Sequence, residues 1–333
     1  MAVRPGRVCV LVLNWRQAKM TEECVRSILA GGFPARDVAV VDNGSGDGSA
    51  EALAAALPEA SHLALPENLG YAGGNNRAIE RALARGYEHV LVLNNDTLVP
   101  PGTIERLLAE MDADPGLAAV QPRVVAFDGR TIENAGGECD RQGATWPRGR
   151  GEDPARSFPR DGFLYASGAC VLLRAEALRT SGAFDGRYFM YHEDADLGWR
   201  LLVHGWRLAL VDDARCLHAE STTAGASPRK IGIIWRNRFA TLLKNYGAWR
   251  ASYRVPRAVL GTLLVACGVA ARQRDWRYPW LWLKAVAWNA RHLRSTLRER
   301  RRVQRLRKVP DREIERFFCP SVEWRMLRSA LRR

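Results

Sequence analysis

The stretch LVLNNDTLVP, Leu91 to Pro100, passes from apolar residues directly into Asn94, Asn95 and Asp96. Such a strand exit has two interpretations. Asn and Asp side chains bond their own backbone and commonly close a strand with a turn. In an open α/β sheet, however, ligands bind beyond the carboxyl ends of the parallel strands, so the same residues would suit a metal or phosphate site. The rest of the chain decides between the two.

Around this stretch, apolar runs of strand length alternate with segments of helical periodicity. The expected strands are VCVLVLNW, DVAVVDN, SHLALPEN and HVLVLNND, separated by helices near 18–30, 50–57 and 72–85. This alternation predicts an α/β protein with a mostly parallel sheet covered by helices on both faces. Every expected strand ends in Asn, Asp or Glu, which would gather amides and carboxylates along one edge of the sheet. Because a nucleotide would lie at that edge, the ligand-site interpretation is favoured.

Length and composition are those of a globular protein. The 333 residues and 47% hydrophobic content can bury the core of one large α/β domain with an appendage, or of two domains. The seven cysteines are odd in number and form no CxxC pair, so we expect no disulfide framework or zinc site and a reducing compartment. The amino-terminal residues lead directly into a strand pattern without the apolar run of a signal peptide.

The net charge of +14 is distributed unevenly. Residues 1–225 hold 23 Lys and Arg against 30 Asp and Glu, whereas residues 226–333 hold 27 against 6. The first part therefore carries −7 and the second +21. We expect chemistry in the acidic body and attachment through the basic, Trp-rich tail.

Six motifs resemble those of the family 2 glycosyltransferases, in particular the bacterial rhamnosyltransferase-like branch. In chain order they are VLVLNWRQ, VVDNGSGDGS, ENLGYAGGNN, LVLNNDT, SGACVLLR and FDGRYFMYHEDADLGWRLLVHGW. The resemblance covers roughly residues 7–245. It implies a GT-A fold, which is Rossmann-like, together with a nucleotide-sugar donor, a divalent metal and an inverting transfer. We therefore expect a GT-A catalytic domain over 1–247 and a helical, basic region over 248–333.

The metal site is expected at Asp96. Asn94-Asn95-Asp96 occupies the place of the family's DxD motif, with Asn instead of the first Asp. A leaving diphosphate needs its charge neutralised by Mg²⁺ or Mn²⁺, which prefer carboxylate oxygens and water. The resemblance implies that His218, after the strand RLALVDDARCLH, completes the site; a structural histidine is the alternative. With one carboxylate fewer than the family pattern, metal affinity is expected to be modest.

Donor contacts are also implied by the resemblance. Asp42 is expected to accept a hydrogen bond from a ring N–H of the pyrimidine base, and a turn cap is its alternative role. In ENLGYAGGNN the glycines let the backbone approach a ligand and the asparagines supply donors, although a glycine-rich helix start needs no ligand. The expected donor-binding residues are Asn14, Asp42, Asn43, Asn68, Gly70, Gly73, Asn75, Asn94 and Asn95.

Glu193, Asp194 and Asp196 form the second chemical centre. Carboxylates in a first helical turn are often only partners of the helix dipole. An inverting transfer, however, needs a base that takes the acceptor hydroxyl proton while the sugar carbon is attacked opposite the leaving group. By resemblance to the family's ED pair, we assign Asp194 as this base and Glu193 as the residue that orients the acceptor. We expect neighbouring like charges to raise the pKa of Asp194.

The tail favours attachment to a membrane surface. The run AVLGTLLVACGVAA, residues 258–271, has 14 uncharged residues, fewer than the roughly 20 that span a bilayer. Together with YPWLWLKAVAW and the Arg-rich segment after it, this run favours an interfacial position on anionic lipid. A helical hairpin packed on the catalytic domain is the alternative.

These features predict a cytoplasmic enzyme that is peripheral on the inner face of the cell membrane. It would transfer rhamnose from dTDP-rhamnose to a hydroxyl of a cell-surface glycan or polyprenyl-linked acceptor, in the synthesis of cell-wall polysaccharide. The first alternative is the same fold with a UDP-hexose donor. The second is a basic membrane- or nucleic-acid-binding protein with an inactive transferase body, which the presence of Asp42, Asp96 and Asp194 opposes. We expect no nucleic-acid partner, because no nucleic-acid module accompanies the basic segment.

Overall fold

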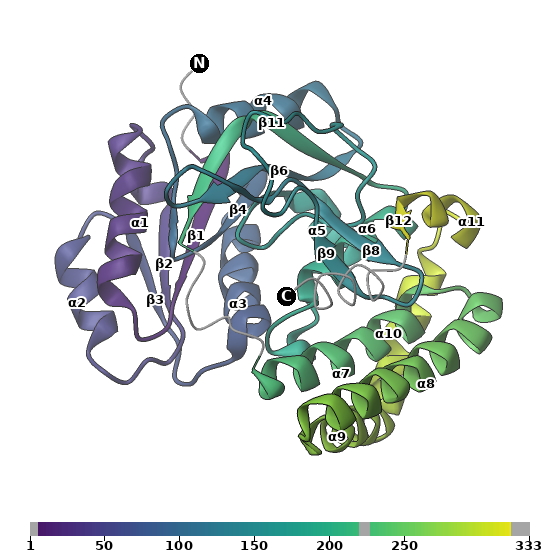
Figure 1. Ribbon diagram of the computed structural model, residues 1–333. Coiled ribbons are helices and arrows are strands. Elements are labelled where there is room, and N and C mark those ends of the chain that lie inside the picture. Colours follow the sequence, from purple (N-terminus) through teal and green to yellow (C-terminus); the bar gives the residue numbers. More distant parts are fainter. Residues whose placement is uncertain (1–5, 220–226, 321–333) are drawn as a thin grey trace.

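A computed structural model describes residues 6–219 and 227–320 of the protein. Its centre is a nine-stranded sheet of order β3-β2-β1-β4-β10-β6-β11-β5, with β7 paired to β6 (Figure 1). The strands of this sheet are β1 Val8–Asn14, β2 Val38–Asp42, β3 Ser61–Ala64, β4 His89–Asn94, β5 Thr97–Leu98, β6 Leu117–Ala126, β7 Ile132–Asn134, β10 Cys170–Arg174 and β11 Arg207–His218. A second, three-stranded sheet consists of β8 Gly137–Asp140, β9 Thr145–Pro147 and β12 Phe318–Cys319.

The first four strands in the chain form a parallel half-sheet. β1 pairs in parallel with β2 and β4, and β2 pairs in parallel with β3. In this register Asn14 is the partner of Asp42 and Leu13 is the partner of Asn94, so the polar strand ends lie along one edge. We call this edge, the carboxyl ends of β1, β2 and β4, the sheet rim. β10 runs antiparallel to both β4 and β6, which makes the sheet mixed, and the predicted α/β class is confirmed.

Helices cover both faces of the sheet, as predicted. Along β1, Val10 and Val12 belong to one apolar cluster with α1, α2 and α4, whereas Leu11 and Leu13 belong to another with α3, α5 and α6. This alternation follows from the two-residue period of a strand. The helices are α1 Ala18–Ala30, α2 Ser49–Ala56, α3 Gly70–Ala84, α4 Thr103–Ala113, α5 Ala175–Ser181 and α6 Glu193–Val203, with short 3₁₀ helices at Ala35–Asp37, Gly186–Tyr188 and Glu315–Phe317.

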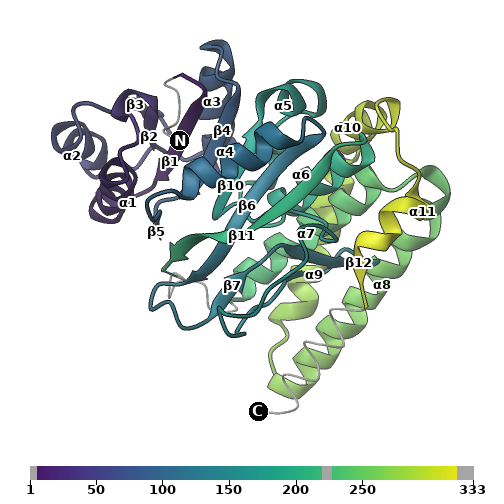
Figure 2. The ribbon, with the colours of Figure 1, turned by 90° about the horizontal axis from the view of Figure 1, so that it is seen from above.

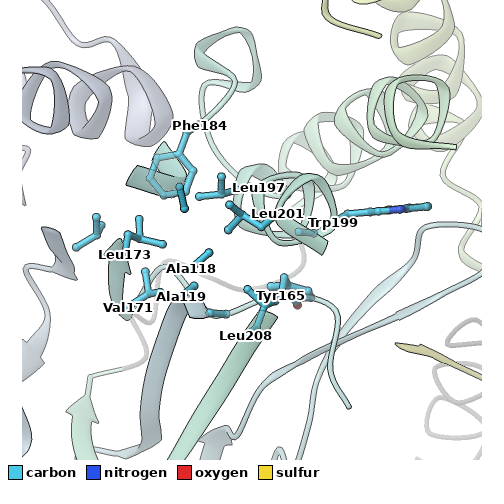
Figure 3. Close-up of a cluster of buried hydrophobic side chains, with 14 of the residues drawn as sticks. Ala118, Ala119, Tyr165, Val171, Leu173, Phe184, Leu197, Trp199, Leu201 and Leu208 are labelled. Carbon is cyan, nitrogen blue, oxygen red and sulfur yellow. The ribbon is translucent and has the colours of Figure 1, made fainter. Parts of the chain in front are cut away.

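Packing against the sheet fixes helix α6, whose first turn carries the predicted acid pair. Leu197 and Leu201 lie one helical turn apart and face Val171 and Leu173 of β10 and Leu208 of β11 (Figure 3). All five side chains are buried. Because deleting such a side chain typically costs about 2–5 kcal/mol, this cluster holds the start of α6 in place relative to the sheet.

The carboxyl-terminal region is helical, as predicted. Figures 1 and 2 show its helices gathered at one side of the sheet. They are α7 Pro228–Asn245, α8 Ala248–Gln273, α9 Arg277–Arg291, α10 Leu293–Arg305 and the short α11 Asp311–Ile314. After α10 the chain returns to the body, where the carbonyl of Val203 accepts hydrogen bonds from the amides of Lys308 and Val309, and β12 pairs with β8. The domain boundary expected after residue 247 stays a prediction.

Helix α8 has one packed face and one exposed face. It buries small side chains at four-residue intervals, namely Ala258, Thr262, Ala266 and Ala270. Between them, Leu260 and Leu264 are 60% and 74% exposed. Within the described ranges, α8 is the one helix that is long and apolar enough to cross a membrane by length and composition.

Candidate active site

Asp42 lies at the sheet rim in a network of hydrogen bonds. Its Oδ1 accepts from Asn14 Nδ2 at 2.7 Å and from the Ser45 hydroxyl at 2.5 Å, and its Oδ2 accepts from the Ser45 amide at 3.0 Å. Asn14 Oδ1 in turn accepts from the Thr21 hydroxyl. Asp42 therefore caps the turn after β2. Since each carboxylate oxygen has two lone pairs, this capping leaves acceptor capacity for a ligand.

Asn43 joins the next rim loop to the first. Its Nδ2 lies 3.1 Å from both Asn68 Oδ1 and the Gly70 carbonyl, and its Oδ1 accepts from the Leu69 amide. The loops approach so closely that a Cβ on Gly44 would lie 2.3 Å from the backbone of the neighbouring loop. Three residues predicted to bind the donor, Asn43, Asn68 and Gly70, are thus brought together.

Gly73 and Asn75 lie further along α3, away from these rim contacts. Asn75 is buried and its Nδ2 donates to the Tyr71 carbonyl within the helix. A Cβ on Gly73 would lie 2.8 Å from the Leu69 side chain. These contacts belong to the packing of α3, and the predicted donor contacts of Gly73 and Asn75 stay predictions.

Asp96 and His218, 122 positions apart in the chain, meet where β5 pairs with β11. His218 Nε2 lies 3.1 Å from Asp96 Oδ1 and 3.5 Å from Asn94 Nδ2. Asn95 instead turns to α1, where its Nδ2 donates to the Thr21 hydroxyl at 3.0 Å. The residues predicted to bind metal therefore lie side by side at the sheet rim.

Sequence reasoning missed Glu133, which lies in β7. Its Oε2 is 2.5 Å from His218 Nδ1. Burial lowers the pKa of His218, but Asp96 and Glu133 outweigh this effect and raise the pKa to about 10. The three residues of β7 have no pattern that marks one of them for function.

The residues present fit a divalent ion shared with a diphosphate. Within residues 6–219 and 227–320, no three His, Cys, Asp or Glu side chains are arranged as a complete metal site. Asp96 Oδ1, however, is buried, and its 3.1 Å contact is the ion pair with Nε2 of His218, so both candidate ligands face the same point. One carboxylate and one imidazole would leave the remaining positions to diphosphate oxygens and water, which is how Mg²⁺ is commonly bound.

Glu193 and Asp194 begin helix α6, and burial raises the pKa of both. The pKa of Asp194 rises to about 6, although the amides of Ala195 and Gly168 oppose the rise. The pKa of Glu193 rises to about 8 through burial and then through the neighbouring Asp194 charge. The predicted rise for Asp194 is confirmed in direction, but desolvation is its cause, whereas the like charge acts mainly on Glu193.

Asp196 has a structural role distinct from this pair. It is fully buried, and its Oδ2 lies 2.9 Å from both Arg200 Nε and Lys244 Nζ. The Arg200 guanidinium also donates to backbone carbonyls before α6, among them that of Ser181 at 2.7 Å. Asp196 and Arg200 therefore tie α6 to α7 and to the preceding loop.

The loop before the acid pair adopts a strained backbone. Phe189, Tyr191 and His192 have φ values of 66°, 65° and 72°, in the left-handed region that side chains disfavour. Asn237 of α7, fully buried, holds this loop: its Nδ2 lies 2.8–3.1 Å from the carbonyls of Tyr188, Met190 and Tyr191. Backbone strain that is fixed by a buried amide is typical of a functional loop.

This strained loop also contacts the start of α3, which Asn43 links to the sheet rim. The Ala72 amide donates to the Phe189 carbonyl at 3.1 Å, and a Cβ on Gly70 would lie 2.4 Å from the same oxygen. The start of α3 and the loop that carries the acid pair therefore touch. A Rossmann-like sheet with polar groups along this rim is the arrangement in which open α/β sheets bind nucleotides.

Comparison with known proteins identifies the family. Residues 5–241 match the model of the family described as glycosyltransferase like family 2, and the chain belongs to this family. The chain is 34% identical over 241 residues to the N-acetylglucosaminyl-diphospho-decaprenol L-rhamnosyltransferase of Mycobacterium tuberculosis, covering 65% of this chain and 78% of that relative. The predicted membership of the rhamnosyltransferase-like branch and the predicted enzyme class are thereby confirmed.

Solved structures confirm the fold. Residues 1-349 of S. aureus TarS in complex with UDP-GlcNAc align with a TM-score of 0.56 at 15% identity, covering 90% of each chain. The mannosyltransferase PcManGT from Pyrobaculum calidifontis, in complex with GDP-Man and Mn²⁺, aligns with a TM-score of 0.51 at 18% identity, covering 85% of this chain and 86% of that one. Nucleotide sugars are bound in both neighbours.

Proposed function

We propose that the protein transfers rhamnose from dTDP-rhamnose, with inversion, to a hydroxyl of a polyprenyl-linked glycan that is built into a cell-surface polysaccharide. The mycobacterial relative, named as an L-rhamnosyltransferase acting on N-acetylglucosaminyl-diphospho-decaprenol, supports the sugar and the lipid-linked acceptor. The structural observation that carries the proposal is the hydrogen bond from Ala72 to Phe189, because it joins the rim to the loop with the acid pair. A donor at the rim would then lie beside the base.

The donor end of the site would be organised by the rim residues. Asp42, fixed by Asn14 and Ser45, would accept a hydrogen bond from the base of the nucleotide. Asp96 and His218 would hold Mg²⁺ or Mn²⁺, and this ion would supply charge neutralisation for the leaving diphosphate. The Mn²⁺ bound in the mannosyltransferase neighbour supports this assignment.

The acceptor end would be organised by the acid pair. The acceptor oxygen attacks the anomeric carbon as the bond from that carbon to the diphosphate oxygen breaks. Asp194 takes the proton of the acceptor hydroxyl, and the lone pairs that the Ala195 and Gly168 amides leave free on its carboxylate are available for this. Glu193, whose raised pKa keeps it protonated at neutral pH, would donate a hydrogen bond that orients the acceptor.

The exposed side chains of α8 and α9 support peripheral attachment at the cytoplasmic face of the membrane. Trp249, Leu264 and Trp276 are 72–77% exposed. Basic residues flank them, and α10 adds the segment LRSTLRERRRVQR. Large apolar side chains beside cationic ones suit the interface of an anionic bilayer.

Thermal unfolding with a panel of nucleotide sugars and Mn²⁺ tests the donor. A ligand that binds only the folded protein raises its stability by mass action, so dTDP-rhamnose should raise Tm more than UDP-glucose or UDP-GlcNAc. A selective rise with a UDP-hexose would replace rhamnose by the alternative donor. No rise with any nucleotide sugar would refute the proposed reaction.

A further inference from the structure

A groove of about 480 Å³ lies between helices α7 and α9. Gly232 of α7 forms part of its wall, and a Cβ at this position would lie 3.0 Å from the Leu281 side chain of α9. The groove has the size of sites that hold small organic ligands, about 300–1,000 Å³. It is therefore larger than a lone phosphate needs.

The groove combines cations with aromatic surfaces. Arg229 and Arg236 line it from α7, and Trp280, Lys284 and Trp288 line it from α9. Lys284 Nζ lies 5.4 Å from the centre of the Trp280 ring, and Arg236 Cζ lies 4.8 Å from that of Trp288. In the part of the chain that the structure describes, no carboxylate pairs with Arg229, Arg236 or Lys284. This uncompensated positive charge favours an anionic ligand.

Helix α7 connects the groove to the loop that carries the acid pair. Arg236, which lines the groove, donates from Nη2 to the Tyr188 carbonyl at 3.0 Å. Near the start of α7, Lys230 Nζ lies 4.9 Å from the Tyr191 ring, two residues before Glu193. A ligand in the groove would therefore lie beside the loop that positions the base.

The groove also borders the exposed apolar side chains of α9. Trp280 is 55% exposed and lines the groove, while Leu283 on the same helix is 47% exposed and Trp276, just before the helix, is 72% exposed. An apolar chain leaving the groove would have a continuous path to this surface. A ligand with an anionic head and a hydrocarbon tail matches both properties.

We propose that the α7–α9 groove binds the diphosphate and the first isoprene units of a polyprenyl-diphosphate acceptor. Arg229, Arg236 and Lys284 hold the diphosphate, and Trp280 and Trp288 contact the isoprene units. This assignment deepens the proposed function and rests on it, because it places the acceptor sugar toward Asp194. The same geometry explains why cations line a groove between two helices that otherwise present apolar surface.

Binding of farnesyl diphosphate to the full chain, followed by calorimetry, tests the assignment. We expect farnesyl diphosphate to bind more tightly than either inorganic diphosphate or farnesol. The double substitution Arg229→Glu with Lys284→Glu should weaken its binding by about 10-fold or more, the scale for losing charged contacts. Arg257→Glu, an exposed position on α8 outside the groove, is a charge-reversal control and should leave this binding unchanged. Because Arg229, Lys284 and Arg257 are all exposed, the double variant and the control should both fold.

Two results on farnesyl diphosphate binding would overturn the assignment: an affinity of the double variant equal to that of the parent, or an equal loss of affinity in the double variant and the Arg257→Glu control. A third such result would be a double variant that loses only its binding to phosphatidylglycerol vesicles. The last would mean that the groove serves lipid headgroups. Donor-induced thermal stabilisation, measured on the same proteins, reports on the proposed function separately. If dTDP-rhamnose stabilises the protein but farnesyl diphosphate does not bind, only the assignment of the groove is refuted. If farnesyl diphosphate binds but dTDP-rhamnose does not stabilise the protein, the proposed reaction is refuted.

Discussion

Glu133 Oε2 lies 2.5 Å from Nδ1 of His218. Nδ1 of the histidine therefore contacts Glu133, and the other ring nitrogen, Nε2, faces Asp96. When a histidine binds a metal, a carboxylate on its other nitrogen fixes the tautomer and the ring orientation. Glu133 is therefore a positioning residue of the proposed metal site.

Glu133→Ala should weaken the binding of Mn²⁺ in the presence of dTDP by about 10- to 100-fold, the usual effect of removing such a partner. Calorimetric titration of Mn²⁺ into the protein with dTDP measures this change. Asp128→Asn removes a carboxylate from the exposed loop between β6 and β7 and serves as the control. An unchanged Mn²⁺ affinity in Glu133→Ala would show that Glu133 does not position a ligand of the ion.

Asp96→Ala should abolish metal-dependent donor binding and leave the fold intact. The side chain lies at the sheet rim, and its loss removes the ion pair with His218 but leaves the contact of that histidine with Glu133 in place. Activity should be lost mainly because the charge on the leaving diphosphate is no longer neutralised. Donor affinity of Asp96→Ala with and without Mn²⁺ gives the answer, and a variant that still responds to Mn²⁺ removes Asp96 from the metal site.

The parallel half of the fold is predictable because its signals are local. Apolar runs such as Leu91 to Leu93 form buried strands, and each polar exit lies at the carboxyl end of its strand. The antiparallel direction of β10 and the position of Glu133 are not predictable in this way. The direction of β10 depends on pairing with β4 and β6, which lie far from it in the chain. Glu133 reaches His218 because β6 pairs with both β7 and the distant β11, and β7 is only three residues long.

The candidate site is likewise predictable from local sequence motifs but not in its long-range contacts. The pattern of the ED pair locates Asp194 at the start of α6, but it does not show that burial, and not a like charge, raises the pKa of this residue. Nor does it show that Asn237, 43 positions later, holds the loop before the pair. Burial and long-range hydrogen bonds are properties of the folded chain.

Asp194→Asn should retain donor binding and lower the transfer rate by about 10²-fold or more, the scale expected for a missing general base. In the unsubstituted protein the base must be deprotonated, so the rate should fall as the pH drops through about 6, the pKa of Asp194. Initial rates between pH 5 and 8 with saturating donor test both statements. Turnover of Asp194→Asn at the rate of the parent would show that Asp194 is not the base.

Glu193→Gln should make the protein more stable at pH 8. An unfolded glutamate ionises near its ordinary pKa of 4.5, whereas burial keeps Glu193 protonated until about pH 8. Between these two values the unfolded state releases a proton that the folded state retains, so the folded state loses about 1.4 kcal/mol per pH unit. The amide cannot ionise and avoids this loss.

Urea unfolding of Glu193→Gln and of the parent at pH 5 and pH 8 measures the effect. The gain in free energy of unfolding should be small at pH 5 and reach a few kcal/mol at pH 8. Glu59→Gln, at an exposed position, should show no such dependence on pH. A gain for Glu193→Gln that is the same at both pH values would mean that Glu193 is ionised in the folded protein.

The full chain should sediment with anionic vesicles at low salt and be released only in part as the salt concentration rises. The basic tail supplies the salt-sensitive component, because the Debye length falls from about 10 Å at 0.1 M to about 3 Å at 1 M. The exposed Trp249, Leu264 and Trp276 supply a component that salt does not screen. Trp249→Ala with Trp276→Ala should remove this second component, whereas Phe127→Ala, 53% exposed outside the tail, should not. Complete release of the parent from the vesicles at 1 M salt would mean that only its cationic side chains contact lipid. Tight binding to RNA without binding to vesicles would mean that the tail is a nucleic-acid-binding segment.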